Sequence, residues 1–185
     1  FAPHIAAWYI WNGTTWEIDT KDVVHYLIHK CARDLANTIA AKNATKIKAA
    51  SNGFAAGSLR LFRSFPGFQA VQTDLDPDPW LLGTPAGTVD LRTGKLRTPD
   101  PNDYITQSTS HAPAPPDTPC PIWRKHIDWV TRGDTQLARN IQQIIGYCLT
   151  GLTVEHAMFF LYGSGRNGKG VLVNTIFKLM GGYAK

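Results

Sequence analysis

The segment Gly163-Ser164-Gly165-Arg166-Asn167-Gly168-Lys169-Gly170, near the C-terminal end of the chain, is the most informative stretch of the sequence. It fits the phosphate-binding pattern G-x-x-x-x-G-K, with Gly170 where a Ser or Thr usually stands. Glycines let the backbone curve closely around a phosphate chain, so that consecutive N–H groups point inward. Lys169 would supply a positive charge to the β and γ phosphates, which makes it the candidate catalytic residue. The segment as a whole is the candidate nucleotide site.

The sequence on both sides of this segment has the order strand, loop, helix that such a site requires. Residues 157–162 (Ala-Met-Phe-Phe-Leu-Tyr) form a short apolar run that predicts a buried strand. After the loop, apolar residues recur at helical spacing until Gly181-Gly182 ends the pattern. The N-terminus of that helix would direct its partial positive charge at a bound anion. An ordinary glycine-rich turn between a strand and a helix remains the alternative interpretation.

Length and composition indicate a globular protein. The 185 residues suffice for one large or two small domains, and 43% hydrophobic residues permit a core. No apolar stretch approaches the length of a membrane span and no signal peptide is evident, which predicts a soluble, cytoplasmic protein. Cys31, Cys120 and Cys148 lie far apart without a C-x-x-C pair. This spacing predicts reduced, buried thiols and no metal site.

The net charge of +5 is unevenly distributed along the chain. Residues 1–65 contain eight basic and four acidic side chains, and residues 121–185 contain eight and three. Between them, residues 66–120 contain three basic and seven acidic side chains. Two basic ends fit a polyanionic partner such as DNA, although a soluble enzyme without nucleic acid can carry this charge as well.

The N-terminal part predicts a hairpin followed by helices. Residues 8–11 and 16–18 are aromatic-rich and flank Asn12-Gly13, which tolerates the positive φ angles of a tight turn. An amphipathic helix is expected over about residues 20–41, with an inward face at helical spacing: Val24, Leu27, Ile28, Cys31, Leu35 and Ile39. Asn43 would cap a second helix, and Gly53 and Gly57 argue against its running unbroken to Phe65.

The second half of the chain predicts a further hairpin, a linker and two helices. Residues 88–97 fit a hairpin, and the five prolines of residues 112–121 exclude regular structure. A short helix over 122–130 precedes one capped by Asp134 or Thr135, with its apolar residues inward and Gly151 at its end. The predicted fold is mixed α/β. It comprises an accessory domain (1–111), a proline-rich linker (112–121) and the beginning of a P-loop NTPase domain (122–185).

Three further clusters each allow a chemical and a structural interpretation. Asp74, Asp76 and Asp78 alternate, so Asp74 and Asp76 could form an Asp-x-Asp metal pair, but capping of turns explains them better. His25 and His29 lie one turn apart and could bind zinc, but without a third ligand they fit a solvated helix face. A set of basic and aromatic residues could contact nucleic acid or could be core aromatics with a solvated basic face: Lys42, Lys46, Lys48, Phe54, Arg60, Phe62, Arg63, Phe65 and Phe68.

A series of spaced motifs resembles the phage and plasmid primase-helicases, a family that includes the poxvirus primase-helicase and has a superfamily 3 motor. The resemblance is strongest from about residue 74 to 184 and thin before residue 70. Its motifs are Asp76-Pro-Asp78-Pro-Trp80-Leu-Leu-Gly83, Gly87-Thr-Val-Asp90-Leu91-Arg-Thr-Gly94, Cys120-Pro121-Ile-Trp123, Gly146-Tyr147-Cys-Leu-Thr-Gly151 and Tyr162 to Gly170.

The resemblance implies an ATP-dependent DNA helicase of phage or plasmid replication, working in a bacterial host. It implies an AAA+-like motor that binds ATP and Mg²⁺, acts as a hexamer on single-stranded DNA and meets other replication proteins. Gly170 departs from the general motif, because glycine lacks the hydroxyl that would bind Mg²⁺. Two alternatives remain: a DNA- or replisome-binding module without ATP turnover, and a P-loop kinase of small molecules.

The ends of the chain predict a fragment of a longer protein. It begins at Phe1, and no acidic strand for Mg²⁺ and the attacking water follows the loop helix. We therefore expect no ATPase activity from this chain alone.

Overall fold

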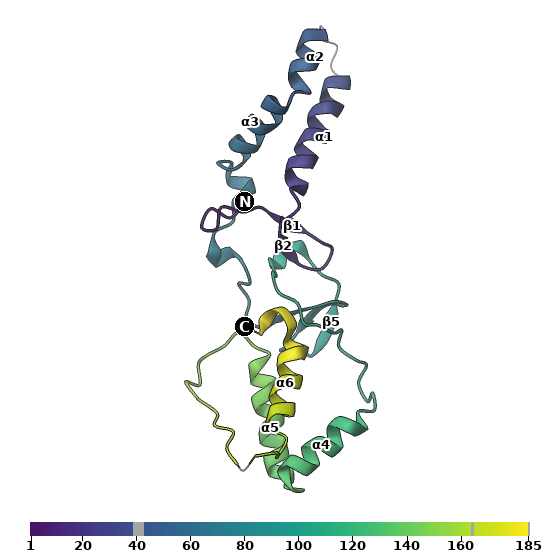
Figure 1. Ribbon diagram of the computed structural model, residues 1–185, viewed down its shortest axis with the longest axis vertical. Helices are drawn as coiled ribbons and strands as arrows, with labels where there is room; N and C mark the ends of the chain where they lie inside the picture. Colours follow the sequence, from purple (N-terminus) through teal and green to yellow (C-terminus); the bar gives the residue numbers. More distant parts are fainter. Residues whose placement is uncertain (39–42, 164, 185) are drawn as a thin grey trace. The chain divides into compact units, whose positions relative to one another are not determined.

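The computed structural model describes residues 1–38, 43–163 and 165–184 and has a mixed α/β fold with small antiparallel sheets. The described chain divides into two units (Figure 1). Unit 1 comprises Phe1–Asn12 and Trp16–Leu75, and unit 2 comprises Gly13–Thr15 and Asp76–Lys185. The mixed fold class is as predicted. The domain boundaries at residues 111 and 121 rest on the sequence alone and stay a prediction.

The N-terminal hairpin has formed as predicted. Strands β1 (Tyr9–Trp11) and β2 (Trp16–Ile18) pair in antiparallel fashion, with Trp11 opposite Trp16. The two indole rings are 5.7 Å apart between centroids, a distance typical of stabilising aromatic pairs. Gly13 has φ +103°, a conformation that glycine adopts without steric cost.

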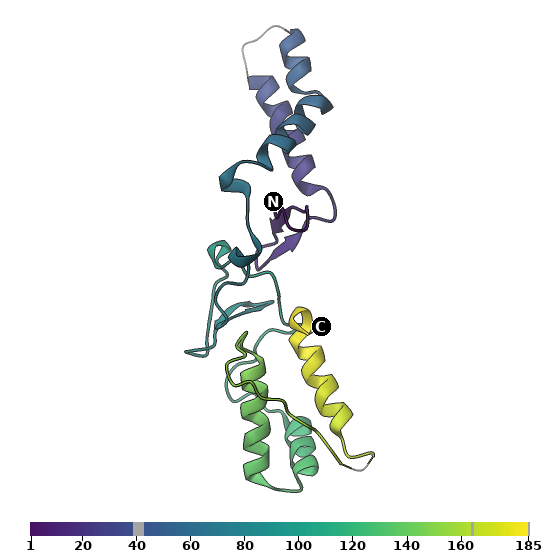
Figure 2. The ribbon, with the colours of Figure 1, turned by 90° about the vertical axis from the view of Figure 1, so that its left-hand side faces the viewer.

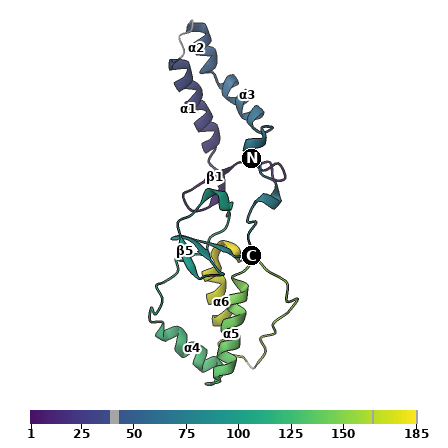
Figure 3. The ribbon, with the colours of Figure 1, turned by 180° about the vertical axis from the view of Figure 1, so that it is seen from behind.

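Three helices follow in unit 1: α1 (Val23–Thr38), α2 (Asn43–Ala49) and α3 (Asn52–Phe62). Figures 1 and 3 show α1 and α3 side by side. Their buried side chains are all alanines, namely Ala32 and Ala36 of α1 and Ala55 of α3. Small side chains let two helices approach closely, so this contact is compact but buries little apolar surface.

The α1 helix confirms the predicted element but not the predicted inward face. Leu27, Cys31 and Leu35 are exposed, whereas Ala32 and Ala36 are buried. The row Ala32 and Ala36 follows the predicted row Cys31 and Leu35 by one residue, which is about 100° of rotation around an α-helix. Close packing against α3 selects the alanine row and turns the larger apolar row outward. Ile39, the last predicted position, lies outside the described residues.

The break between α2 and α3 falls at Ser51 and not at a glycine. The Ser51 side chain caps α3 by accepting a hydrogen bond from the Phe54 backbone N–H at 3.3 Å. Gly53 and Gly57 both lie inside α3. An N-cap serine offsets part of the helix propensity that two glycines remove, so α3 runs through both of them to Phe62.

Unit 2 contains a three-stranded antiparallel sheet in the order β3-β4-β5. Its strands are β3 (Leu81–Thr84), β4 (Gly87–Asp90) and β5 (Lys95–Arg97). The β4–β5 pair is the predicted hairpin, with Asp90 opposite Lys95. The β3 strand was not predicted individually, and it adds the most buried residues of the sheet, including Leu82, Gly83 and Thr84.

The helices of unit 2 are α4 (Pro121–Thr131), α5 (Thr135–Cys148) and α6 (Lys169–Met180), and Figure 2 shows α4 beside α5. Asp134 caps α5 by accepting from the Leu137 N–H at 3.0 Å, as predicted. The predicted inward face of α5 is covered only in part: Ile141, Ile144 and Ile145 are partly buried, Leu137 and Cys148 are exposed, and no α5 residue is fully buried. Contact with α4 covers only part of this helix.

The described residues also form four 3₁₀ helices, namely Pro66–Phe68, Gln72–Asp74, Pro101–Asp103 and, after α6, Gly181–Tyr183. The expectation of buried thiols is wrong. Cys31, Cys120 and Cys148 are free and exposed. Each lies on a helix surface or a helix end that no other described element covers.

The predicted buried strand over residues 157–162 is also wrong. This segment has no regular structure, and Figure 1 draws it as a thin trace without an arrow. Its side chains are exposed, with Tyr162 at 92%. A strand needs a neighbour for its backbone N–H and C=O groups, and no strand in the described part of the chain pairs with this segment.

The C-terminal end of α6 is fixed to the sheet of unit 2 by hydrogen bonds. The Gly83 N–H donates to the Tyr183 hydroxyl at 2.8 Å, and that hydroxyl donates to the Gln107 carbonyl at 3.2 Å. Gly182 N–H donates to the Ser108 carbonyl at 2.9 Å. Burial raises the pKa of Tyr183 to about 12, so the phenol is protonated and able to donate at neutral pH.

Replacing Tyr183 by Phe is expected to lower the free energy of unfolding by about 1–3 kcal/mol, because two half-buried backbone groups lose their partner. Urea denaturation followed by circular dichroism measures this change. Tyr26→Phe is the control, because the Tyr26 side chain is 65% exposed. Equal stability of Tyr183→Phe and the parent would contradict the expected role of the hydroxyl.

Candidate phosphate-binding site

The candidate loop has a backbone that only small or flexible residues adopt easily. Gly163 and Gly168 have φ values of +146° and +78°, and Arg166 has +59°. Gly168 forms the N-cap of α6, so the loop leads directly into the N-terminus of a helix. The first N–H groups of an α-helix have no partner within the helix and attract anions. Ser164 lies outside the described residues.

Lys169 brings the two ends of the loop together. Its Nζ atom donates to the Gly163 carbonyl at 3.1 Å and to Asn167 Oδ1 at 2.7 Å. A Cβ atom at Gly163 would lie 2.4 Å from Asn167 Nδ2 and would displace that side chain, and the φ of Gly163 also favours glycine. The ammonium group therefore lies within the curve of the loop, held by Gly163 and Asn167.

The last glycine before the helix packs against α4. A Cβ atom at Gly168 would lie 2.6 Å from Trp129, 2.7 Å from Val130 and 2.9 Å from His126. The His126 ring stands between Trp123 and Trp129, with centroid distances of 5.9 and 6.1 Å. Sequence reasoning missed this support of the loop by α4, since no local pattern links residues that are about 40 positions apart.

The remaining loop positions are open. A Cβ atom at Gly165 or Gly170 would meet nothing within 4 Å, and Arg166 is exposed. No cluster of three or more His, Cys, Asp or Glu side chains that could hold a metal occurs among residues 1–38, 43–163 and 165–184. Mg²⁺ commonly keeps several waters and binds through nucleotide phosphates, so a protein cage is not required for it.

The three alternating aspartates all have structural partners, and Asp74 caps a 3₁₀ helix as predicted. Asp74 accepts from the Val71 N–H at 2.9 Å, and Asp76 accepts from the Thr106 N–H at 2.8 Å. Asp78 forms a two-pronged ion pair with Arg92, with N–O distances of 2.9 and 3.0 Å. These hydrogen bonds hold the pKa of the Asp78 carboxyl below its usual range.

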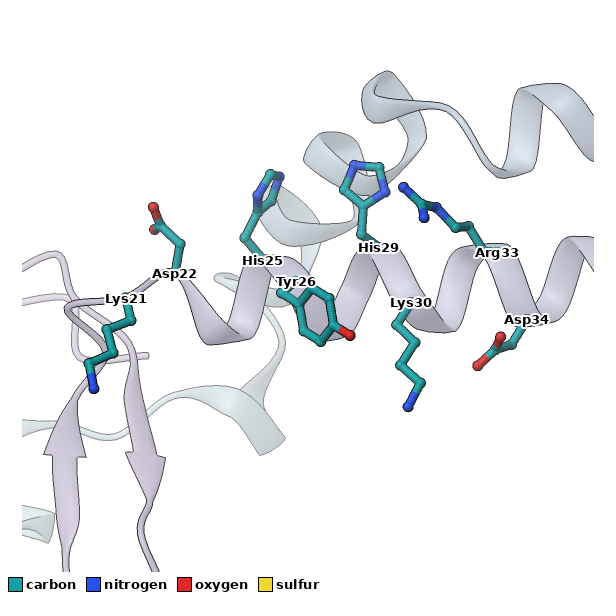
Figure 4. A pocket seen from close by; sticks show the side chains of 8 residues that line it. All are labelled: Lys21, Asp22, His25, Tyr26, His29, Lys30, Arg33 and Asp34. Atoms are coloured by element: carbon teal, nitrogen blue, oxygen red, sulfur yellow. The ribbon is translucent and has the colours of Figure 1, made fainter.

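His25 and His29 lie on one face of α1 (Figure 4). Their rings meet edge to face at 5.5 Å, and both are half-buried, which differs from the solvated face that was predicted. The shallow pocket around them also contains Lys21, Lys30 and Arg33. Two carboxylates, Asp22 and Asp34, line the same pocket, so its charges are mixed.

The basic and aromatic set of residues 42–68 is not a core. The Phe62 ring contacts the rings of Phe65 and Phe68, with centroid distances of 6.3 and 5.0 Å. Phe65 and Phe68 are themselves about half exposed. Phe54 is 44% exposed. The interpretation of these rings as core aromatics is therefore wrong: Phe62 is partly buried and the others are exposed. Lys42 lies outside the described residues.

Residues 1–132 match the protein family described as D5 N terminal like. The chain therefore belongs to this family, the N-terminal domain of D5-type primase-helicase proteins of phages, plasmids and poxviruses. It is a replication-protein domain of the primase-helicase type. Among curated proteins, none matches the chain.

The matched region corrects the extent of the resemblance. It begins at residue 1, so the N-terminal hairpin and helices belong to the family domain, although they carried little of the resemblance. It continues through the proline-rich segment to the end of α4 and stops before the candidate loop. In the described part of the chain, no helix has the length and apolar character needed to cross a bilayer.

Proposed function

We propose that the segment from Gly163 to Gly170 binds the phosphates of ATP and forms part of an ATP-dependent DNA helicase. The observation that carries the proposal is the position of Lys169 Nζ, 3.1 Å from the Gly163 carbonyl and 2.7 Å from Asn167 Oδ1 at the N-terminus of α6. A cation inside a glycine loop at the N-terminus of a helix is what a polyphosphate requires. Family membership supports the replication context.

In this proposal each loop residue has a simple role. Gly163, Gly165 and Gly168 allow the backbone to curve around the phosphates, and Lys169 supplies the charge. Asn167 positions the Lys169 side chain through its 2.7 Å hydrogen bond. ATP would bind with Mg²⁺, and the motor would act as a hexamer on single-stranded DNA, with other replication proteins, in the cytoplasm of a bacterial host.

The proposal is tested by titrating a fluorescent ATP analogue into the chain and into its Lys169→Ala variant, as set out in the Discussion. Loss of binding in the variant supports the phosphate site. If the parent chain binds single-stranded DNA but no nucleotide, the non-catalytic DNA-binding module is the better description. Phosphorylation of a small substrate would instead favour the kinase.

Replacing Gly170 by Ser in the full-length protein is expected to lower the Mg²⁺ concentration for half-maximal ATP turnover. A Cβ atom at position 170 would meet nothing within 4 Å, so a serine side chain fits there. Its hydroxyl can take the place of one water around the metal. The Mg²⁺ midpoint at saturating ATP measures the effect, with Gly170→Ala as the control for helix propensity. An unchanged midpoint with intact nucleotide affinity would show that the metal shell does not involve position 170.

A further inference from the structure

A groove on α3 combines bare helix backbone, exposed apolar side chains and a positive charge. Gly53, Phe54, Gly57, Arg60 and Leu61 line it, together with two serines, and we call it the α3 groove. Figures 1 and 3 show α1 beside α3. Ala55 is the buried residue of α3, whereas the residues that line the groove are partly or fully exposed, and a Cβ atom at Gly57 would meet nothing within 4 Å. The α3 groove lies wholly within unit 1.

The two glycines make the floor of the α3 groove accessible. A Cβ atom at Gly57 would meet nothing within 4 Å, and one at Gly53 would only reach the Ser51 hydroxyl at 4.0 Å. Glycine at two positions one turn apart costs roughly 1 kcal/mol each in helix propensity. Beside this floor, Phe54 and Leu61 are 44% and 64% exposed. A flat ligand can therefore lie against the helix backbone with an aromatic ring next to it.

The charge around the α3 groove favours an anionic occupant. Residues 35–73 contain five basic side chains and no acidic one. Arg60 lies in the groove itself, and the ion pairs formed among the described residues involve Arg92 and Arg97 instead. The pocket on α1 differs from it, since Asp22 and Asp34 offset most of the positive charge of the three basic side chains there (Figure 4).

We propose that the α3 groove binds single-stranded nucleic acid, with Arg60 on a phosphate and Phe54 stacked against a base. Single-strand binding surfaces combine positive charge that follows the backbone with aromatic rings that stack on bases. A duplex would expose no base faces to Phe54, and an apolar partner helix would leave Arg60 without a counter-charge. The proposal rests on the DNA-dependent function proposed above and gives that function a contact surface.

The test uses the 185-residue chain without nucleotide, so that failure of the ATP site leaves its outcome untouched. Binding of a fluorescein-labelled oligo-dT strand is followed by anisotropy at several salt concentrations. Gly57→Leu fills the groove and should weaken binding at least tenfold, although leucine is the better helix former. Gly146→Leu is the matched control, because Gly146 lies in α5 with nothing within 4 Å of its Cβ. It should bind as the parent does.

Two further variants separate charge from stacking. Arg60→Gln should reduce the slope of log affinity against log salt by about 0.7, the value for one phosphate contact on a single strand. Phe54→Leu should weaken binding about tenfold with an unchanged slope, since it removes stacking but no charge. Arg139→Gln, on an exposed position of α5, is the control for net charge.

Three outcomes would overturn the proposal. The first is oligo-dT binding by Gly57→Leu and Arg60→Gln within twofold of the parent. The second is equal loss in Gly57→Leu and Gly146→Leu, which would indicate a general defect. The third is a concentration-dependent dimer in size-exclusion chromatography that Gly57→Leu abolishes while DNA binding persists, because the groove would then hold a second copy of the chain.

Discussion

Lys169→Ala is expected to weaken ATP binding by roughly 100-fold and to abolish ATP turnover in the full-length protein. The β and γ phosphates lose their counter-charge, and a hydrogen bond to a charged group contributes about 1.5–3 kcal/mol. The packing of Gly168 against α4 keeps the helix end of the loop in place, whereas the Lys169 contacts to Gly163 and Asn167 are lost together with the charge. Titration with a fluorescent ATP analogue measures binding, and phosphate release measures turnover.

Lys178→Ala is the matched control for this experiment. Lys178 is the other lysine of α6 and is exposed in the last turn of the same helix. Its removal changes the net charge equally but leaves the loop untouched, so nucleotide affinity should remain that of the parent. Parental turnover by Lys169→Ala would show that this lysine does not contact phosphate and that the proposed site is wrong.

Gly83→Ala is expected to lower the free energy of unfolding by about 3 kcal/mol, the upper end of the usual range for an overpacked core. The added methyl group would lie 2.3 Å from the Gln107 carbonyl oxygen and 2.8 Å from Ile105. The first neighbour is backbone, which cannot rotate away as a side chain can. Urea denaturation followed by tryptophan fluorescence gives the measurement, with Trp80 next to the affected strand.

Gly146→Ala provides the comparison in the same unit. It lies inside α5 in open space, so alanine should raise stability by up to about 1 kcal/mol through helix propensity. Opposite signs for the two substitutions are therefore expected. A Gly83→Ala variant as stable as the parent would mean that β3 does not approach residues 105–107 as closely as described.

Local patterns were sufficient for elements whose partners are close in the sequence. The hairpins at Asn12-Gly13 and Arg92–Gly94 depend on turn residues, and α5 depends on an Asp134 cap; both kinds of signal act within a few residues. Family membership was also predictable, because the motifs that carry the resemblance are continuous in the sequence.

Predictions from local sequence patterns were wrong where contacts with residues distant in the sequence determine which segment forms a strand or which helix face is buried. An apolar run such as residues 157–162 fits a buried strand, but only a pairing partner turns it into one, and the described residues contain none. The α1 helix buries Ala32 and Ala36 because α3 approaches closely, although the larger residues of the next row predicted the opposite face. The position of the candidate loop followed from its glycines and lysine. The packing of Gly168 against Trp129 and His126 could not be predicted, because no pattern in the sequence near the loop indicates it.

The hydrogen bonds of Tyr183 have a mechanical consequence for α6. A helix of 12 residues is a stiff rod about 18 Å long, and this one is anchored to the sheet at one end and carries the loop at the other. The loop end of α6 packs against α4 at Gly168, and its other end joins Tyr183 through Gly181 and Gly182. A displacement of Lys169 is therefore transmitted along the helix to these two glycines and, through the Tyr183 hydroxyl, to β3 and Gln107.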